Sequence, residues 1–235
     1  MDNWNLRNFR NDLSRFIALI DLHSVTGDFQ KLRDLLYGLS NKDLVEYEVK
    51  DICFYIRGPI AGTQPVNMNY FQLKFSNMLM VKDNLTQEED PLFGYYLDLF
   101  IEAYKTEQNT TKSLCSSWHL DRHFNTQNVK YTHPTYHFQF GGKKMELIDE
   151  EMSVLSCPRI PHPPMDIFLG FHFILSNFFN NRNFQFVNSL LEDYDYQEII
   201  KRAQERLWTP YFKGFDSANT HQDFTLKKMF PLYIN

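Results

Sequence analysis

The chain has 235 residues and a formal net charge of −5, with 24 Lys and Arg against 29 Asp and Glu. A hydrophobic fraction of 43%, with 22 Phe and 13 Tyr, is ample for a core and excludes an intrinsically disordered protein. The acidic balance excludes a broad phosphate-binding surface, which requires clustered Lys and Arg. We therefore expect a single domain over residues 1–235 in which any contact with nucleic acid is local.

Cysteine placement and hydropathy bear on the cellular compartment. Cys53, Cys115 and Cys157 are widely spaced and form no Cys-x-x-Cys pair, so neither a disulfide framework nor a thiolate zinc site is indicated. The amino terminus lacks the basic and apolar regions of a secretory signal. The strongest apolar run, 167–179, is shorter than the roughly 20 residues of a membrane span. These features predict a cytoplasmic protein that is not inserted in a membrane.

Residues 1–40 are predicted to be helical. Apolar residues over 5–22 recur at spacings of three and four, which places them on one helical face. A second helix is predicted over 28–39, where the carboxylate of Asp28 is able to cap free backbone amides. We expect these two helices to form a hairpin.

The apolar period changes to two after residue 41, so residues 42–142 are predicted to form an antiparallel sheet. An interruption near residues 50–53 indicates a turn or a bulge in the first strand. The last two strands are expected to form a hairpin through residues 125–128, whose side chains favour turns. The predicted strands cover residues 45–56, 70–80, 95–105, 114–124 and 131–140.

The segment after the sheet, 158–164, reads Pro-Arg-Ile-Pro-His-Pro-Pro and is predicted to be a stiff connector, because proline excludes helix interiors and central strands. Helices are predicted over 165–179, with Pro164 in the first turn, and over 196–208, ended by Pro210. Residues 164–210 should therefore form a C-terminal helical layer. The predicted fold is α+β, a meander of about five antiparallel strands with N-terminal helices and this layer over one face.

Five of the eight histidines lie in the predicted final hairpin and the connector after it. Alternation along a strand places His119, Asp121 and His123 on one face, and His133 and His137 on one face of the partner strand. A suitable register gathers the four imidazoles around the carboxylate. The candidate catalytic residues are His119, Asp121, His123, His133 and His137.

This histidine cluster has three functional interpretations. One is acid–base catalysis with Asp121 orienting a tautomer, which suits phosphodiester cleavage without a metal. Another is a divalent metal site with ligands from different strands, because His119 and His123 lie about 13 Å apart on a flat strand. A third is anion binding by protonated imidazoles with Arg122 or Arg159. The alternative to all three is an ordinary solvent-exposed polar face of the sheet.

The hairpin and connector also carry a spaced pattern of residues. It consists of Trp118, Leu120, Asp121, His133, Pro134, His137, Gly141, Gly142 and residues 158–161. This pattern resembles bacterial proteins of unknown function from toxin or phage-defence operons. Its shorter part, a Trp and Asp strand followed by His-x-x-x-His and Gly, is similar to the TumE-like toxins of toxin–antitoxin pairs. The resemblance implies a context of bacterial conflict.

Two classes of function follow. The first is a non-catalytic subunit of a multi-protein anti-phage defence or toxin–antitoxin-like assembly, which binds a larger effector protein encoded nearby. The acidic balance, the absence of common enzyme motifs and the 16% aromatic content favour it. The second is a small His/Asp-dependent nuclease or hydrolase that acts as the toxic effector. No motif predicts a cofactor, although histidines from different strands are able to bind a divalent metal.

Overall fold

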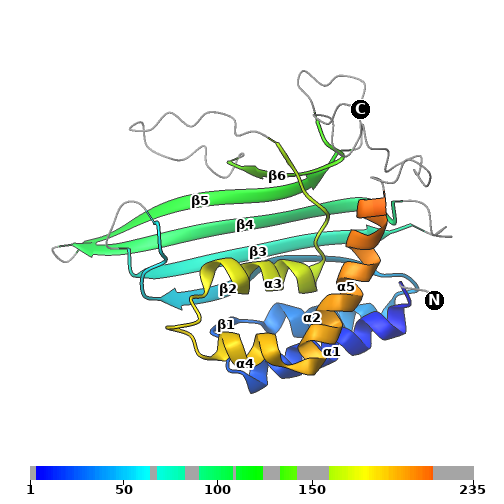
Figure 1. Ribbon diagram of the computed structural model, residues 1–235, viewed down its shortest axis with the longest axis horizontal. Helices are drawn as coiled ribbons and strands as arrows, with labels where there is room; N and C mark the ends of the chain where they lie inside the picture. Colours follow the sequence, from blue (N-terminus) through cyan, green and yellow to red (C-terminus); the bar gives the residue numbers. More distant parts are fainter. Residues whose placement is uncertain are drawn as a thin grey trace.

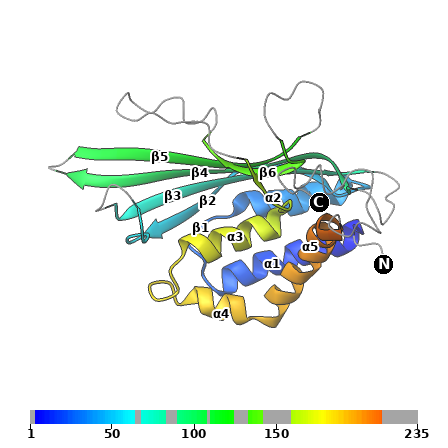
Figure 2. The ribbon, with the colours of Figure 1, turned by 45° about the horizontal axis from the view of Figure 1, so that its top comes forward.

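The computed structural model forms two layers, a sheet and a set of helices that cover one of its faces (Figure 2). The sheet has seven antiparallel strands in chain order, so the predicted α+β class with an antiparallel sheet is confirmed. The other sheet face carries none of the described helices (Figure 2). The structure describes residues 4–63, 68–82, 90–107, 110–123, 133–141 and 159–213.

The five predicted strands correspond to the five long strands of the sheet (Figure 1). Two further strands, β1 and β7, contain two residues each and were not predicted, because a period of two cannot be recognised over so short a segment. The strands are β1 (Gly27–Asp28), β2 (Glu46–Arg57), β3 (Tyr70–Val81), β4 (Leu92–Glu107), β5 (Thr110–Arg122), β6 (Tyr136–Phe140) and β7 (Ile160–Pro161).

One strand is shorter than predicted, and one predicted irregularity of another strand is present in the structure. The strand predicted over 131–140 was too long, since β6 begins only at Tyr136 and Pro134 before it has no amide for a ladder. The predicted bulge in β2 is confirmed by a register shift between Val49 and Ile52. Asp51 has φ +53 there, and its amide donates to Ser76 Oγ at 3.0 Å. The turn predicted over 125–128 lies outside the described residues.

The helices come from both ends of the chain and pack on the same face of the sheet (Figure 2). The Asp28 carboxylate accepts a hydrogen bond from the Gln30 amide at 3.1 Å, as predicted. None of the helices in the described residues is long and apolar enough to span a membrane. The helices are α1 (Leu6–Leu22), α2 (Gln30–Gly38), α3 (Ile167–Phe178), α4 (Phe186–Glu192) and α5 (Tyr194–Lys213), with a 3₁₀ turn at Leu39–Asn41.

Helix α3 occupies the centre of the core. Gly170 allows its close approach to the sheet, because a Cβ there would lie 2.4 Å from the Phe75 ring of β3. The next residue of α3, Phe171, contacts Phe54 of β2 and Phe16 of α1 at ring-centroid distances of 4.8 and 5.0 Å. Aromatic contacts of this kind join α1, α3 and the sheet in one core.

The start of α3 and the end of α5 correct two sequence predictions. Asp166, not Pro164, determines where α3 begins, because its carboxylate caps the first turn of the helix. Pro210 was predicted to end the last helix, but it lies inside α5, which continues to Lys213. The fully buried Tyr211 follows it. Tertiary packing of this side chain therefore outweighs the local cost of proline in a helix.

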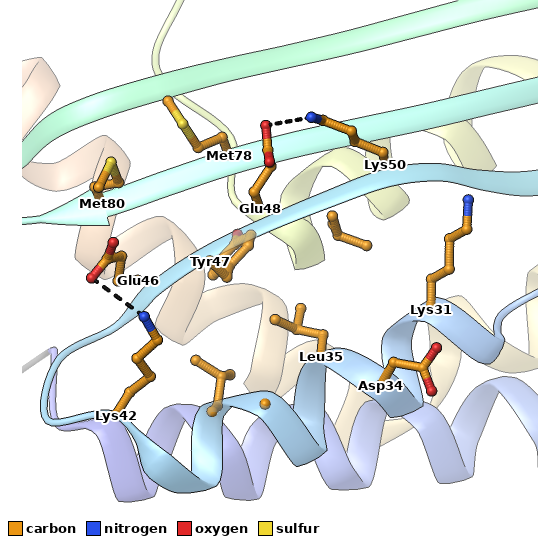
Figure 3. A pocket seen from close by; sticks show the side chains of 13 residues that line it. Lys31, Asp34, Leu35, Lys42, Glu46, Tyr47, Glu48, Lys50, Met78 and Met80 are labelled. Carbon is orange, nitrogen blue, oxygen red and sulfur yellow. Dashed lines mark ion pairs between the residues drawn. The ribbon is translucent and has the colours of Figure 1, made fainter.

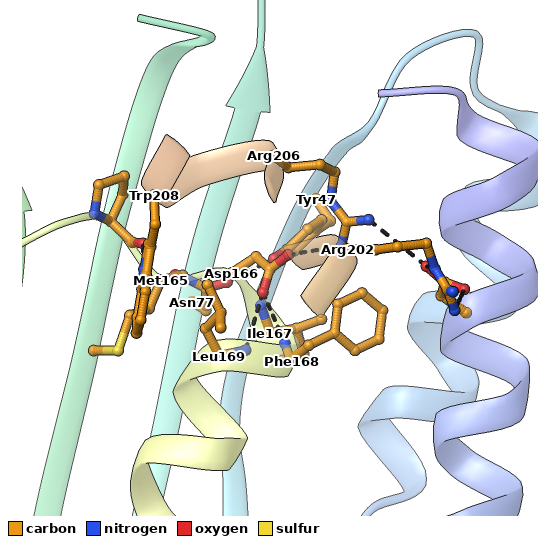
Figure 4. A network of polar contacts seen from close by, with 12 residues as sticks. Tyr47, Asn77, Met165, Asp166, Ile167, Phe168, Leu169, Arg202, Arg206 and Trp208 are labelled. Carbon is orange, nitrogen blue, oxygen red and sulfur yellow. Dashed lines mark hydrogen bonds and ion pairs between the residues drawn. The ribbon is translucent and has the colours of Figure 1, made fainter. Parts of the chain in front are cut away.

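A buried ion network connects three helices (Figure 4). Arg206 of α5 donates to Asp166 at the start of α3 at 3.1 Å and lies 3.6 Å from Asp12 of α1. Arg202, one turn earlier on α5, donates to Asp12 at 2.7 Å. Asp166 is 0% exposed and Asp12 is 5% exposed. The network thus holds α1, α3 and α5 in one arrangement over the sheet.

Candidate functional site

The pairing of β5 with β6 determines which polar side chains meet on the helix-free face of the sheet. Asp121 lies directly opposite His137, and His119 lies opposite Gln139. Between these positions Leu120 points to the other face and is completely buried beneath the helices. Alternation therefore separates a polar face from an apolar one, and the register brings together side chains that the sequence could place only on separate strands.

Three of these side chains converge. His119 and Asp121 are two residues apart on β5, and His137 is the cross-strand neighbour, so their side chains form a triangle on one face. One potential ligand atom from each lies within 4.8 Å of the other two. His119 Nε2 is 3.5 Å from Asp121 Oδ2. Two ligands of one tetrahedral zinc ion lie roughly 3.4 Å apart, so this separation is close to that of a metal site.

The other two histidines extend the cluster outward. The His133 ring is 4.4 Å from the His137 ring and 4.0 Å from the His123 ring, centroid to centroid. The His123 amide donates to the Thr135 carbonyl at 2.7 Å, which continues the pairing beyond the ends of the two strands. All five candidate catalytic residues therefore line one cavity of about 330 Å³.

The buried imidazole at the centre of this cavity is held neutral. His137 is 3% exposed. Burial lowers its pKa to about 3, and the neighbouring His133 and Arg159 act in the same direction. Burial also lowers the pKa of His133, and it raises the pKa of Asp121 against the opposing effect of His119. A neutral imidazole at pH 7 has a lone pair available for a metal ion.

Three buried nitrogen atoms of the cavity have no hydrogen-bond partner among the described residues, namely His123 Nε2, His137 Nδ1 and Arg159 Nε. Leaving such an atom unsatisfied costs about 1–3 kcal/mol, so native proteins contain few. His172 in α3 differs, because its Nδ1 is 3.0 Å from the Tyr196 hydroxyl. The concentration of unsatisfied donors and acceptors in one cavity indicates a binding site.

The two arginines proposed for anion binding have different positions. Arg122 alternates to the helix-facing side, where its Nε donates to Asp90 at 2.7 Å and its guanidinium lies 5.9 Å from the Tyr136 ring. Both arginines line the cavity, but no carboxylate of the described residues lies within ion-pair distance of Arg159. The structure thus brings Arg159 to the histidines, whereas Arg122 belongs to a buried ion pair.

Sequence reasoning missed the role of Asp90. Its side chain is 0% exposed and accepts hydrogen bonds from Arg122 and from the Tyr136 hydroxyl. These partners are 32 and 46 residues away in sequence. No local pattern of charge or hydropathy carries a pairing over that separation, so the sequence offers no signal for it.

A larger groove of about 750 Å³ runs between α2 and the edge of β2 (Figure 3). Four of its six charged side chains pair with one another, Lys50 with Glu48 at 3.0 Å and Lys42 with Glu46 at 3.8 Å. The long charged side chains stay well exposed to solvent. Because these charges are already paired and hydrated, the smaller histidine cavity is the stronger candidate for chemistry.

Comparison with known proteins adds no further support. No family model, no curated protein and no solved structure matches this chain. The resemblance to toxin and phage-defence proteins stays a prediction, and the histidine cavity is the basis for assigning a function.

Proposed function

We propose that this protein is a metal-dependent hydrolase whose divalent ion, such as Zn²⁺, is bound by His119, Asp121 and His137. The observation that carries the proposal is the convergence of these three side chains, one of which, His137, has a buried imidazole nitrogen without a partner among the described residues. Two imidazoles and one carboxylate are a common ligand set for catalytic zinc. Asp121 is in this view a ligand rather than a residue that orients a histidine.

The number of ligands favours a catalytic over a structural ion. Structural zinc sites use four protein ligands, whereas catalytic sites use three and keep one position for water or substrate. Among the described residues, the group in metal-binding proximity contains three. A bound ion of this kind supplies a Lewis acid and makes a water molecule acidic enough to act as a nucleophile near neutral pH.

The surrounding residues suit proton transfer. His133 contacts the ring of His137 and, in turn, the ring of His123, so a chain of imidazoles leads from the triad to the cavity rim. Imidazole is the side chain most often used to move protons during catalysis. His133 is therefore placed to accept a proton from the attacking water, and His123 to pass it to solvent.

Metal stoichiometry tests the proposal directly. Purified protein dialysed against Zn²⁺ should retain one ion per chain by elemental analysis, and His119→Ala, Asp121→Asn and His137→Ala should each weaken the affinity by about 100-fold or more. Glu102→Gln is the matched control, since this carboxylate on β4 already pairs with Lys74 at 2.6 Å. Retention of the ion by all three variants, or no binding by the parent protein, would exclude the site.

Binding to a larger effector, the other function that the sequence favours, stays a prediction. The exposed large apolar side chains of the described residues come from several helices, strands and a loop, and this distribution does not mark one interface. They are Leu22, Tyr37, Leu44, Phe93, Ile160, Tyr194 and Phe212.

A further inference from the structure

Arg159 enters the cavity from a different part of the chain than the histidines. It precedes β7, which pairs with β6 through Phe138 opposite Ile160 and His137 opposite Pro161. This short edge strand positions the guanidinium beside the outer histidines. The prolines around it restrict the backbone, so the arginine is presented from a stiff support.

Arg159 differs from the other arginines that are buried or partly buried. Arg122, Arg202 and Arg206 each form an ion pair with a buried aspartate. Arg159 has no such partner among the described residues, although its Nε is buried. Arg10 on α1 also has a buried Nε without a partner, so that feature alone does not identify a site. At Arg159 it coincides with two unsatisfied imidazole nitrogens in one cavity.

We propose that Arg159, His123 and His133 bind the phosphate group of a phosphoester substrate beside the metal triad. This inference rests on the proposed metal-dependent hydrolase and names its substrate class. The guanidinium offers two parallel N–H donors to two phosphate oxygens, and each imidazole adds a further donor. An ion held by the metal triad would supply positive charge to the same anion that Arg159, His123 and His133 bind.

The number and arrangement of donors favour phosphate over carboxylate. A carboxylate has two oxygens in one plane, whereas donors approach this cavity from β5, from the segment before β6 and from the segment before β7. A tetrahedral anion matches donors that come from several directions. A cavity of about 330 Å³ is at the small end of ligand sites, so it takes the ester group and leaves the rest of the substrate outside.

The reaction at such a group is a hydrolysis without change of oxidation state. The oxygen of water forms a bond to phosphorus, and the bond from phosphorus to the ester oxygen breaks. The released alcohol takes one proton, and the other proton of the water passes to His133. Arg159 remains bound to the phosphate oxygens, where it stabilises the charge that develops during the transfer.

Inorganic phosphate is the probe for this binding site. We expect calorimetry to show phosphate binding to the zinc-loaded protein, and Arg159→Gln to weaken it by about 10- to 100-fold while one zinc ion per chain is retained. Arg159→Lys keeps the charge but loses the paired donors, so it should restore only part of the affinity. Arg57→Gln, which removes an exposed arginine of β2, is the matched control and should bind as the parent does.

The outcomes separate this inference from the proposed function. If zinc binds at one ion per chain but phosphate does not bind, or binds equally to Arg159→Gln, the substrate class is wrong and the metal site remains. If zinc does not bind, the metal proposal fails, and phosphate binding that depends on Arg159 would still support the anion site. Circular dichroism of each variant shows whether the fold is retained.

Turnover identifies the source of the phosphate group. We expect the zinc-loaded protein to hydrolyse bis-p-nitrophenyl phosphate, a diester, or p-nitrophenyl phosphate, a monoester, with loss of the activity in Arg159→Gln. Cleavage of the diester would indicate a nuclease-type substrate, and cleavage of the monoester would indicate a phosphatase-type substrate. Failure to hydrolyse either ester would overturn the inference.

Discussion

Two clusters of buried polar residues in this protein differ in whether their hydrogen-bonding groups are satisfied. Asp166 receives hydrogen bonds from the Phe168 and Leu169 amides at 3.1 and 3.0 Å and from Arg206 at 3.1 Å (Figure 4). The histidine cavity also gathers buried polar groups, yet it contains three buried nitrogen atoms without partners among the described residues. We call the Asp166 cluster the closed network, because its carboxylate is fully hydrogen-bonded within the chain. We call the histidine cavity the incomplete cluster, because several of its buried nitrogen atoms have no partner among the described residues.

The difference indicates what each cluster is for. In the Asp166 network Arg206 Nε is the one buried side-chain atom of the described residues without a partner, and its guanidinium lies 5.3 Å from the Phe9 ring and 5.6 Å from the Phe168 ring. Such a network stabilises one arrangement of helices. A cluster that leaves imidazoles and a guanidinium unsatisfied loses stability, and the loss is recovered when a ligand binds.

The largest expected effect is on the closed network. Asp166→Ala removes the helix cap of α3 and leaves Arg206 buried with one of its two acidic partners, so we expect the free energy of unfolding to fall by about 3–5 kcal/mol. Urea denaturation followed by circular dichroism measures it. The control Asp195→Ala breaks an exposed pair with Arg15 and should change stability by less than about 1 kcal/mol. Equal effects of the two variants would contradict the distinction.

A smaller effect of opposite sign is expected in the incomplete cluster. His137→Leu removes a buried nitrogen without a partner, so the metal-free protein should gain about 1 kcal/mol in its free energy of unfolding, while zinc binding is lost. His172→Leu is the matched control in α3. It leaves the buried Tyr196 hydroxyl without its bond at 3.0 Å and should lower stability by about 1–3 kcal/mol. Measurements in a chelator, by urea denaturation, compare the two.

A loss of stability in His137→Leu similar to that in His172→Leu would count against the proposed site. It would show that the His137 ring makes favourable interactions in the metal-free protein. The sign of the change in the free energy of unfolding therefore distinguishes a residue that serves ligand binding from a residue that stabilises the fold.

How much the sequence predicts differs between the fold and the site. Helix α1 and strands β2 to β5 were recognisable because each repeats its apolar period over many residues. Helix α4, with seven residues, and the two-residue strands were too short for that. The helix through Pro210 was also beyond prediction, because the burial of Tyr211 is a tertiary contact.

At the site, alternation correctly placed His119 and Asp121 on one face of β5. It did not specify that Asp121 lies opposite His137, because the register depends on the whole hairpin. The ion pair of Arg122 with Asp90 was hidden from the sequence, since the two residues are 32 positions apart. Sequence pattern thus identifies the residue types of a site, and long-range pairing decides which of them meet.

The groove between α2 and β2 gives the smallest expected effect and completes the comparison (Figure 3). Lys42 and Glu46 in this groove are paired, as the charges of the Asp166 network are, but they are exposed, with side-chain exposures of 48% for Lys42 and 42% for Glu46. Because exposed pairs contribute little, Lys42→Ala should change the free energy of unfolding by less than about 0.5 kcal/mol and leave zinc and phosphate binding unaltered. Urea denaturation and calorimetry check both. A large loss of stability or of ligand binding would mean that exposed charge pairs also organise this protein. The contrast between the closed network and the incomplete cluster would then no longer identify the histidine cavity as its functional site.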